Sequence, residues 1–135
     1  MSKILTDLFA EFATDEAAER NGTWLPYKTS EFLVARLGNK DYADKLSKLY
    51  EQNRKKIEAG GEEAEKLNID LMIDVLATTI LKGWKDVAYR GEPLEYSVEN
   101  AKKVLRHAEF RRVVTEMASD VDNYRAKLEA EQQKN

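Results

Sequence analysis

The sequence predicts a compact single domain that is mainly α with a small β-hairpin near the N-terminus (α+β), built from about four to five helices. Three observations lead to this prediction. Apolar residues recur with helical spacing along most of the chain, whereas one short stretch is rich in aromatic and β-branched residues. Of the 135 residues, 42% are hydrophobic and 35% are charged, which is the composition of a globular helical protein with enough apolar surface for a core.

The composition also limits the chemistry that the chain can perform. There is no cysteine and one histidine, which excludes disulfides, thiolate nucleophiles and metal sites built from several histidines. The formal net charge of -3 argues against a dedicated nucleic-acid binder, and no apolar run approaches the roughly 18–20 residues that span a bilayer. We therefore expect a cytoplasmic protein with no enzymatic activity, no cofactor, no metal and no membrane or nucleic-acid partner.

The first helix is predicted near the N-terminus, where apolar residues lie at positions i, i+1, i+4, i+5 and i+8 of one helical stripe. These residues are Ile4, Leu5, Leu8, Phe9 and Phe12. Thr14 is expected to cap a second short helical turn, because Asp15 and Glu16 follow it and carboxylates favour a helix start. Asn21-Gly22 should then end that turn.

A β-hairpin is predicted over residues 22–37, where aromatic and β-branched residues surround the polar connection Lys28-Thr29-Ser30. Pro26 cannot donate a hydrogen bond to a neighbouring strand, so its strand should lie at the edge of the sheet. Arg36 is the charged exception in the second strand. It either reaches solvent or a carboxylate of this chain, or it binds a partner.

A helix over residues 42–57 follows, with one narrow apolar stripe and the basic end Arg54-Lys55-Lys56, which suits a helix C-terminus. Ala59-Gly60-Gly61 should break the chain before a longer helix over residues 62–89. One stripe of that helix consists of Ile69, Met72, Ile73, Leu76, Ile80, Trp84 and Val87.

The long helix carries a second apolar stripe, Leu67, Leu71 and Val75, on its other side. Two stripes mean that the helix is covered on both sides, either by its own neighbours or by another protein. In the second case Leu67, Leu71, Val75 and Trp84 would form the surface that binds the partner.

Residues 89–96 read as a loop with Gly91 and Pro93, after which Ser97 caps a short helix. A joint is expected at residues 107–109, before a last helix that ends at Leu128. The tail 129–135 offers no apolar anchor and should fray. The predicted organisation is therefore one domain over residues 1–128 with a flexible C-terminal tail.

Two stretches of the chain resemble a known family. The first comprises Asn21-Gly22-Thr23-Trp24 and the run 32–42, in which Ala35-Arg36-Leu37-Gly38-Asn39 precedes Tyr42. The second comprises Leu81-Lys82-Gly83-Trp84 and the run 91–101, in which a glycine turn leads to Tyr96-Ser97 and a helix. Their order and spacing, over about residues 9–125, resemble the tail assembly chaperones of long-tailed, siphophage-type bacteriophages. The residues that match the family pattern are Trp24, Arg36, Gly38, Asn39, Tyr42, Gly91, Tyr96 and Ser97.

This resemblance implies a non-enzymatic assembly factor in the cytoplasm of the infected host cell. Such proteins bind the long, apolar, helical tape measure protein, keep it soluble and promote polymerisation of the tail tube around it. The resemblance further implies absence from the mature virion, and a ribosomal frameshift that yields a longer form able to recruit the tail tube protein. We also expect self-association, because a second apolar stripe would otherwise stay exposed.

Two other classes of function compete with this interpretation. A structural head–tail connector or minor tail protein could share a small helical fold, and its presence in purified particles would distinguish it. A small nucleic-acid-binding regulator would use Arg106, Arg111 and Arg112, although Glu109 and Glu116 dilute that patch. Steep salt dependence of DNA binding would indicate this third class.

Overall fold

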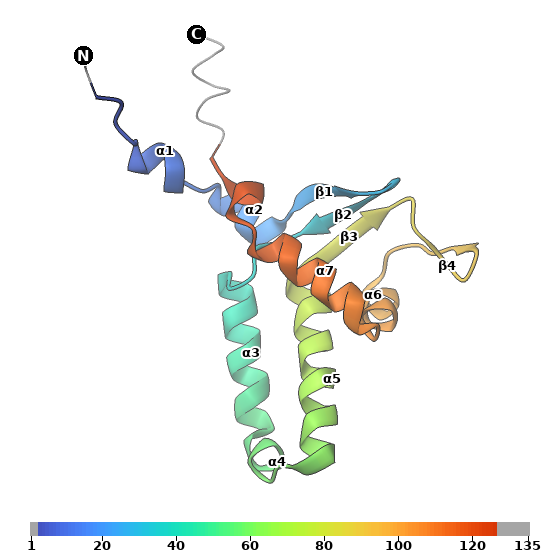
Figure 1. The fold of residues 1–135 in the computed structure, drawn as a ribbon. Helices are drawn as coiled ribbons and strands as arrows, with labels where there is room; N and C mark the ends of the chain where they lie inside the picture. The colour runs from blue at the N-terminus through green and yellow to red at the C-terminus, as the bar shows by residue number, and fades with distance from the viewer. Residues whose placement is uncertain (1–2, 127–135) are drawn as a thin grey trace.

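The fold combines a three-stranded antiparallel sheet, with the strand order β1-β2-β3, with helices that pack against it (Figure 1). The computed structural model describes residues 3–126. The elements are, in order, α1 (Leu8–Phe12), α2 (Glu16–Asn21), β1 (Thr23–Tyr27), β2 (Ser30–Val34), α3 (Lys40–Gln52), α4 (Arg54–Glu58), α5 (Gly61–Thr79), β3 (Leu81–Lys85), β4 (Ala88–Tyr89), β5 (Glu92–Pro93), α6 (Val98–Leu105), α7 (Ala108–Ser119) and a 3-10 turn, η1 (Val121–Tyr124). The α+β prediction is confirmed: four longer helices, α3, α5, α6 and α7, join the small sheet in one domain.

The predicted hairpin forms between β1 and β2, with Tyr27 opposite Ser30 and Lys28-Thr29 as the turn. Lys28 adopts a φ of 53°, the left-handed conformation that tight hairpin turns require. Strand β1 is the edge of the sheet, as Pro26 predicted. The α2 helix ends at Asn21-Gly22 as expected, but its cap is Asp15, whose carboxylate accepts from the Ala18 N–H at 3.1 Å. The prediction of Thr14 as that cap is therefore wrong by one residue.

The third strand corrects the prediction of a continuous helix over residues 62–89. Helix α5 ends at Thr79, and Leu81–Lys85 pairs antiparallel with β2, so that Trp84 lies opposite Phe32. The i+4 spacing of Ile80 and Trp84 is the same as that of a helical stripe. The free edge of β2, however, presents a row of backbone N–H and C=O groups, and a further strand pairs with them through hydrogen bonds.

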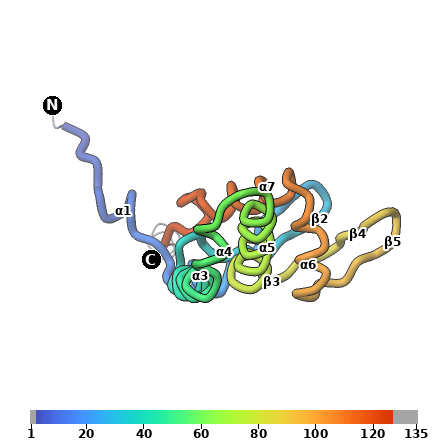
Figure 2. Tube along the Cα trace, turned by 90° about the horizontal axis from the view of Figure 1, so that it is seen from below, coloured from blue at the N-terminus to red at the C-terminus, as the bar shows by residue number. Residues whose placement is uncertain are grey.

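Helices α3 and α5 run side by side and project from the sheet as a helical hairpin, with α4 at its far end (Figures 1 and 2). The predicted break at Gly60-Gly61 is confirmed, and both glycines have positive φ angles. The expected helix 42–57 is divided at Asn53, whose side-chain amide donates to the Leu49 carbonyl at 2.8 Å. Such a bond competes with the helical ladder and ends α3 there.

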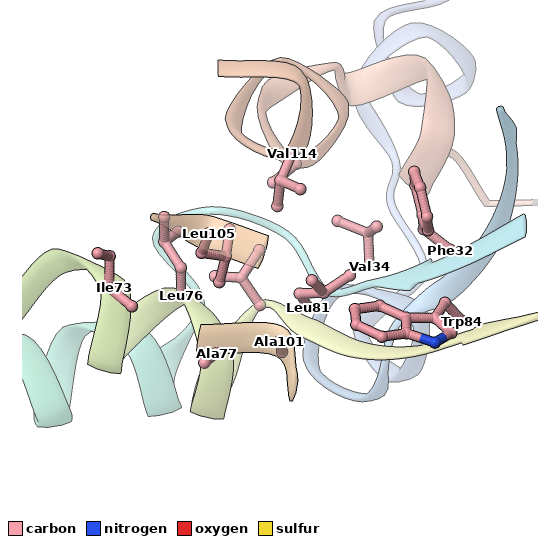
Figure 3. Packing of buried hydrophobic residues seen from close by; sticks show 12 residues of the cluster. Phe32, Val34, Ile73, Leu76, Ala77, Leu81, Trp84, Ala101, Leu105 and Val114 are labelled. Carbon is pink, nitrogen blue, oxygen red and sulfur yellow. The ribbon is translucent and has the colours of Figure 1, made fainter. Parts of the chain in front are cut away.

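The core lies where α5, α6 and α7 meet the inner face of the sheet (Figure 3). Side chains from all these elements are buried, including Val34, Leu76, Leu81, Ala101, Leu105 and Val114, each with no exposed surface. Phe32 packs edge-on against Phe110 of α7, with ring centroids 5.6 Å apart. No single helix could hide its apolar stripe alone, and the shared core explains why the predicted elements form one domain.

The C-terminal elements follow the predicted pattern as far as the structure describes them. Ser97 caps α6 by accepting from the Asn100 N–H at 3.0 Å, and the chain bends between Leu105 and Ala108. The last helix, however, ends at Ser119 and gives way to the η1 turn, which buries Tyr124. Leu128 and the predicted tail 129–135 lie outside the described residues.

Candidate functional site

The N-terminal residues 3–13 form an apolar arm that stands away from the rest of the molecule (Figures 1 and 2). Its five large apolar side chains are largely exposed: Ile4 by 98%, Leu5 by 81%, Leu8 by 65%, Phe9 by 68% and Phe12 by 70%. They are the residues of the stripe that predicted the first helix. The prediction of a helix there holds for Leu8–Phe12, but none of the residues of this short helix is buried.

Local physical chemistry explains why the helical part of the arm is short. The Asp7 carboxylate accepts hydrogen bonds from the Phe9 and Ala10 N–H groups, at 3.0 and 3.2 Å, and so starts α1 at Leu8. Five helical residues are far fewer than an isolated helix needs for stability in water. Because no packing supports residues 3–7, the stripe of apolar side chains is only partly helical.

The root of the arm, in contrast, is tied to the end of the described chain. Thr14 forms a β-bridge with Arg125, and two backbone bonds flank it: Asp15 N–H to Tyr124 O at 2.8 Å, and Ala126 N–H to Ala13 O at 3.0 Å. The Arg125 guanidinium donates to the Glu11 carbonyl and to the Asp122 carboxylate. The Asp122 bond raises the pKa of Arg125. The fold therefore holds the arm by its base and leaves its apolar side chains uncovered.

The predicted partner-binding residues do not form a surface. Leu71 and Val75 are 8% and 0% exposed, and Leu67 is half-buried, because α3 and α4 pack on one side of α5 and α6 on the other. Trp84 lies on β3, not on the helix, and is 7% exposed. Of the two alternatives for the second stripe, the structure has the one in which the neighbours of α5 cover it. The most exposed large apolar side chains, at 65–98%, lie instead on the arm.

The residues that match the family pattern cluster at two junctions of the fold. At the first, Asn39 lies between β2 and α3: its side chain donates to the Arg36 carbonyl at 2.8 Å and accepts from the Tyr42 N–H at 3.0 Å. The Arg36 guanidinium forms an ion pair with the Glu19 carboxylate at 3.2 Å. Of the alternatives predicted for Arg36, the structure therefore has the pairing with a carboxylate of this chain. Gly38 adopts a φ of 86°, where a side chain would be strained.

The second junction holds the 91–97 loop against β3. The Trp84 indole N–H donates to the Leu94 carbonyl at 2.8 Å, and the Tyr96 hydroxyl donates to the Leu81 carbonyl at 2.8 Å. The Trp84 and Tyr96 rings pack edge to face, 5.3 Å apart, and burial raises the pKa of Tyr96. The turn uses Gly91 with a φ of 82°. Trp24, on the outer face of the sheet, stacks under the Lys85 ammonium at 4.0 Å. These motif residues therefore maintain the fold.

Asn39→Ala is expected to lower the free energy of unfolding by about 1–2 kcal/mol. The substitution removes the cap of α3 and leaves the nearly buried junction without its donor to the Arg36 carbonyl. Urea unfolding followed by circular dichroism measures the loss. Asn39→Asp is the informative companion, because it keeps the capping oxygen but cannot donate. A stability of Asn39→Asp equal to that of the unmodified protein would show that the donor bond contributes nothing.

Other surfaces of the described residues offer less to a partner. The hollow between α3 and α5 is lined mainly by polar side chains, among which Lys45 pairs with Asp74 at 3.2 Å. Within residues 3–126 no group of three or more acidic or histidine side chains is placed to hold a metal ion. None of the described helices has the length and apolar character that crossing a membrane requires.

The fold and the arm together define a class: a small α+β domain with a complete core that displays an apolar segment. Residues 37–135, more than half of the chain, match the family model described as "YdaY prophage protein". The chain belongs to this family and is a phage-derived protein. The matched part begins after β2, so the arm and the β1–β2 hairpin precede it. No curated protein and no solved structure matches the chain.

Proposed function

We propose that this protein is a phage tail assembly chaperone that binds apolar helical segments of the tape measure protein in the host cytoplasm. The observation that carries the proposal is the exposure of the arm. Its five large apolar side chains are 65–98% exposed, whereas the apolar side chains of the core are buried. Membership in a prophage protein family and the resemblance of the two motif stretches to tail assembly chaperones support it.

The arm has the features needed for reversible capture of an apolar helix. A helix-in-groove contact uses apolar anchors at helical spacing, and the arm presents such a stripe from Ile4 to Phe12. Burying one large apolar side chain contributes roughly 1.5–3 kcal/mol, so even part of the stripe offsets the entropy lost when the arm orders. The formal net charge of -3 on the whole chain favours solubility of the loaded complex.

The arm leaves the domain at a fixed base, so changes in it should not disturb folding. We expect Leu8→Asp combined with Phe9→Asp to abolish solubilisation of a co-expressed tape measure protein, because two charged side chains in an apolar interface cost several kcal/mol. The client then moves from the supernatant to the pellet. The measurement is the soluble fraction of the client, with the circular dichroism of the variant chaperone as the check on its fold.

Tyr50→Asp combined with Val98→Asp is the matched control, since these residues are 38% exposed and lie on α3 and α6. This pair should leave the client soluble. Equal loss of solubility in both double variants, or no loss in the arm variant, would contradict the proposal. Detection of the protein in purified particles would favour a structural connector or minor tail protein instead.

A further inference from the structure

We propose that, without a client, the arms of two copies of this chain pair antiparallel and cover one another. The inference concerns residues 3–12 and is independent of client binding. It starts from the position of the arm: in two perpendicular views, α1 lies apart from the sheet and from the α3–α5 helical hairpin (Figures 1 and 2). Two such arms can meet without contact between the two domains.

The exposed apolar area of the arm is as large as the largest apolar patch that a monomer ordinarily leaves in water. Aromatic side chains bury about 150–250 Å² each, so Phe9 and Phe12, at 68% and 70% exposure, offer roughly 200–350 Å². Ile4, Leu5 and Leu8 lie on the same stripe. With them, the exposed apolar area of the arm reaches the upper end of the roughly 300–600 Å² that the largest apolar patch of a monomer covers. Two arms in contact approach the roughly 1,200 Å² at which specific interfaces begin.

The charges of the arm select a second copy in antiparallel orientation. Lys3 lies at one end of the stripe and Glu11 at the other, and both side chains are exposed, although the Glu11 carboxylate also lies 3.5 Å from the Arg125 guanidinium. In an antiparallel pair each lysine faces the glutamate of the other copy, whereas a parallel pair places like charges together. Asp7, midway between them, faces Asp7 of the other copy in either orientation and therefore does not decide between the two. A two-fold contact of this kind is self-complementary, so it closes at two copies. The surface that covers the arm is therefore the same stripe on another copy.

Sedimentation equilibrium of the full chain at low salt and without a client tests the pairing. We expect a reversible dimer. Lys3→Glu alone and Glu11→Lys alone should each weaken it by about three- to tenfold, because each creates two like-charge contacts. Equimolar mixing of the two variants should restore the dimer, since the carboxylate introduced into one chain then faces the ammonium introduced into the other. Lys66→Glu, which makes the same charge change on α5, is the matched control and should dimerise like the unmodified protein.

Phe9→Ser combined with Phe12→Ser should give a monomer with an unchanged circular dichroism spectrum, since neither side chain belongs to the core. If the unmodified protein is monomeric at every concentration measured, the inference is wrong. So does a dimer that survives loss of both phenylalanines, or one that Lys3→Glu weakens no more than Lys66→Glu does. Each of these results leaves the proposed capture of a client standing, because none of the measurements includes one.

Discussion

Trp84→Ala is expected to lower the free energy of unfolding by about 3–5 kcal/mol. The indole is 7% exposed, lies opposite Phe32 across the β2–β3 ladder and packs against the Tyr96 ring. Its removal leaves a cavity and also takes away the donor to the Leu94 carbonyl, which holds the 91–97 loop on the sheet. Urea unfolding, followed by far-ultraviolet circular dichroism, measures the change.

The matched control is Trp24→Ala on the outer face of the same sheet. Trp24 is 40% exposed and its ring stacks against the Lys85 ammonium on the outer face, so its loss should cost only about 1 kcal/mol. Trp84→Phe keeps an aromatic ring in the core. It should therefore fold, and its stability can be measured, even if Trp84→Ala does not fold. Similar losses for Trp84→Ala and Trp24→Ala would show that Trp84 is not a core anchor.

Alkaline pH should destabilise the protein through Tyr124. This side chain is 1% exposed, and its hydroxyl donates to the Val34 carbonyl at 3.0 Å. Burial raises the pKa of Tyr124 far above the ordinary value near 10. Above pH 10 the unfolded chain therefore releases this proton while the folded chain keeps it. The free energy of unfolding contributed by Tyr124 is complete below pH 10 and falls by up to about 1.4 kcal/mol per pH unit above it.

Tyr124→Phe isolates this contribution from the other groups that titrate at high pH. The variant should lose about 1–2 kcal/mol at pH 7, because the Val34 carbonyl loses its buried donor. The difference between the two proteins should then shrink as the pH rises from 10 to 11.5. Urea unfolding at a series of pH values measures it. A difference that stays constant over this range would mean that Tyr124 ionises in the folded protein as readily as in water.

The local features of the fold could be predicted because they depend on neighbours in sequence. The hairpin turn at Lys28-Thr29, the break at Gly60-Gly61 and the cap at Ser97 all lie where residue type indicated them. Each depends on a φ angle or on a side chain that reaches a backbone group two or three residues away. Such preferences act before any tertiary contact forms.

The exposed apolar surface, on which the proposed function rests, could not be assigned in the same way. The stripe from Ile4 to Phe12 and the stripe from Leu67 to Val75 both have helical spacing, yet the first is largely exposed and the second is mostly covered. Periodicity reports that a helix has an apolar side, and it does not report whether another element of the chain reaches that side. The predicted client surface was therefore placed on residues that pack inside the domain.

The sequence by itself determined the helical class, the edge hairpin, the break at Gly60-Gly61 and the motif stretches. The tertiary structure decided that Leu81–Lys85 is a strand, that α5 is covered on both sides and that the apolar side chains of the arm stay largely exposed. The physical reason is that burial and strand pairing are long-range effects. An apolar side chain or an unpaired backbone group is satisfied only by a segment distant in the chain, and its position is known only when the whole chain has folded.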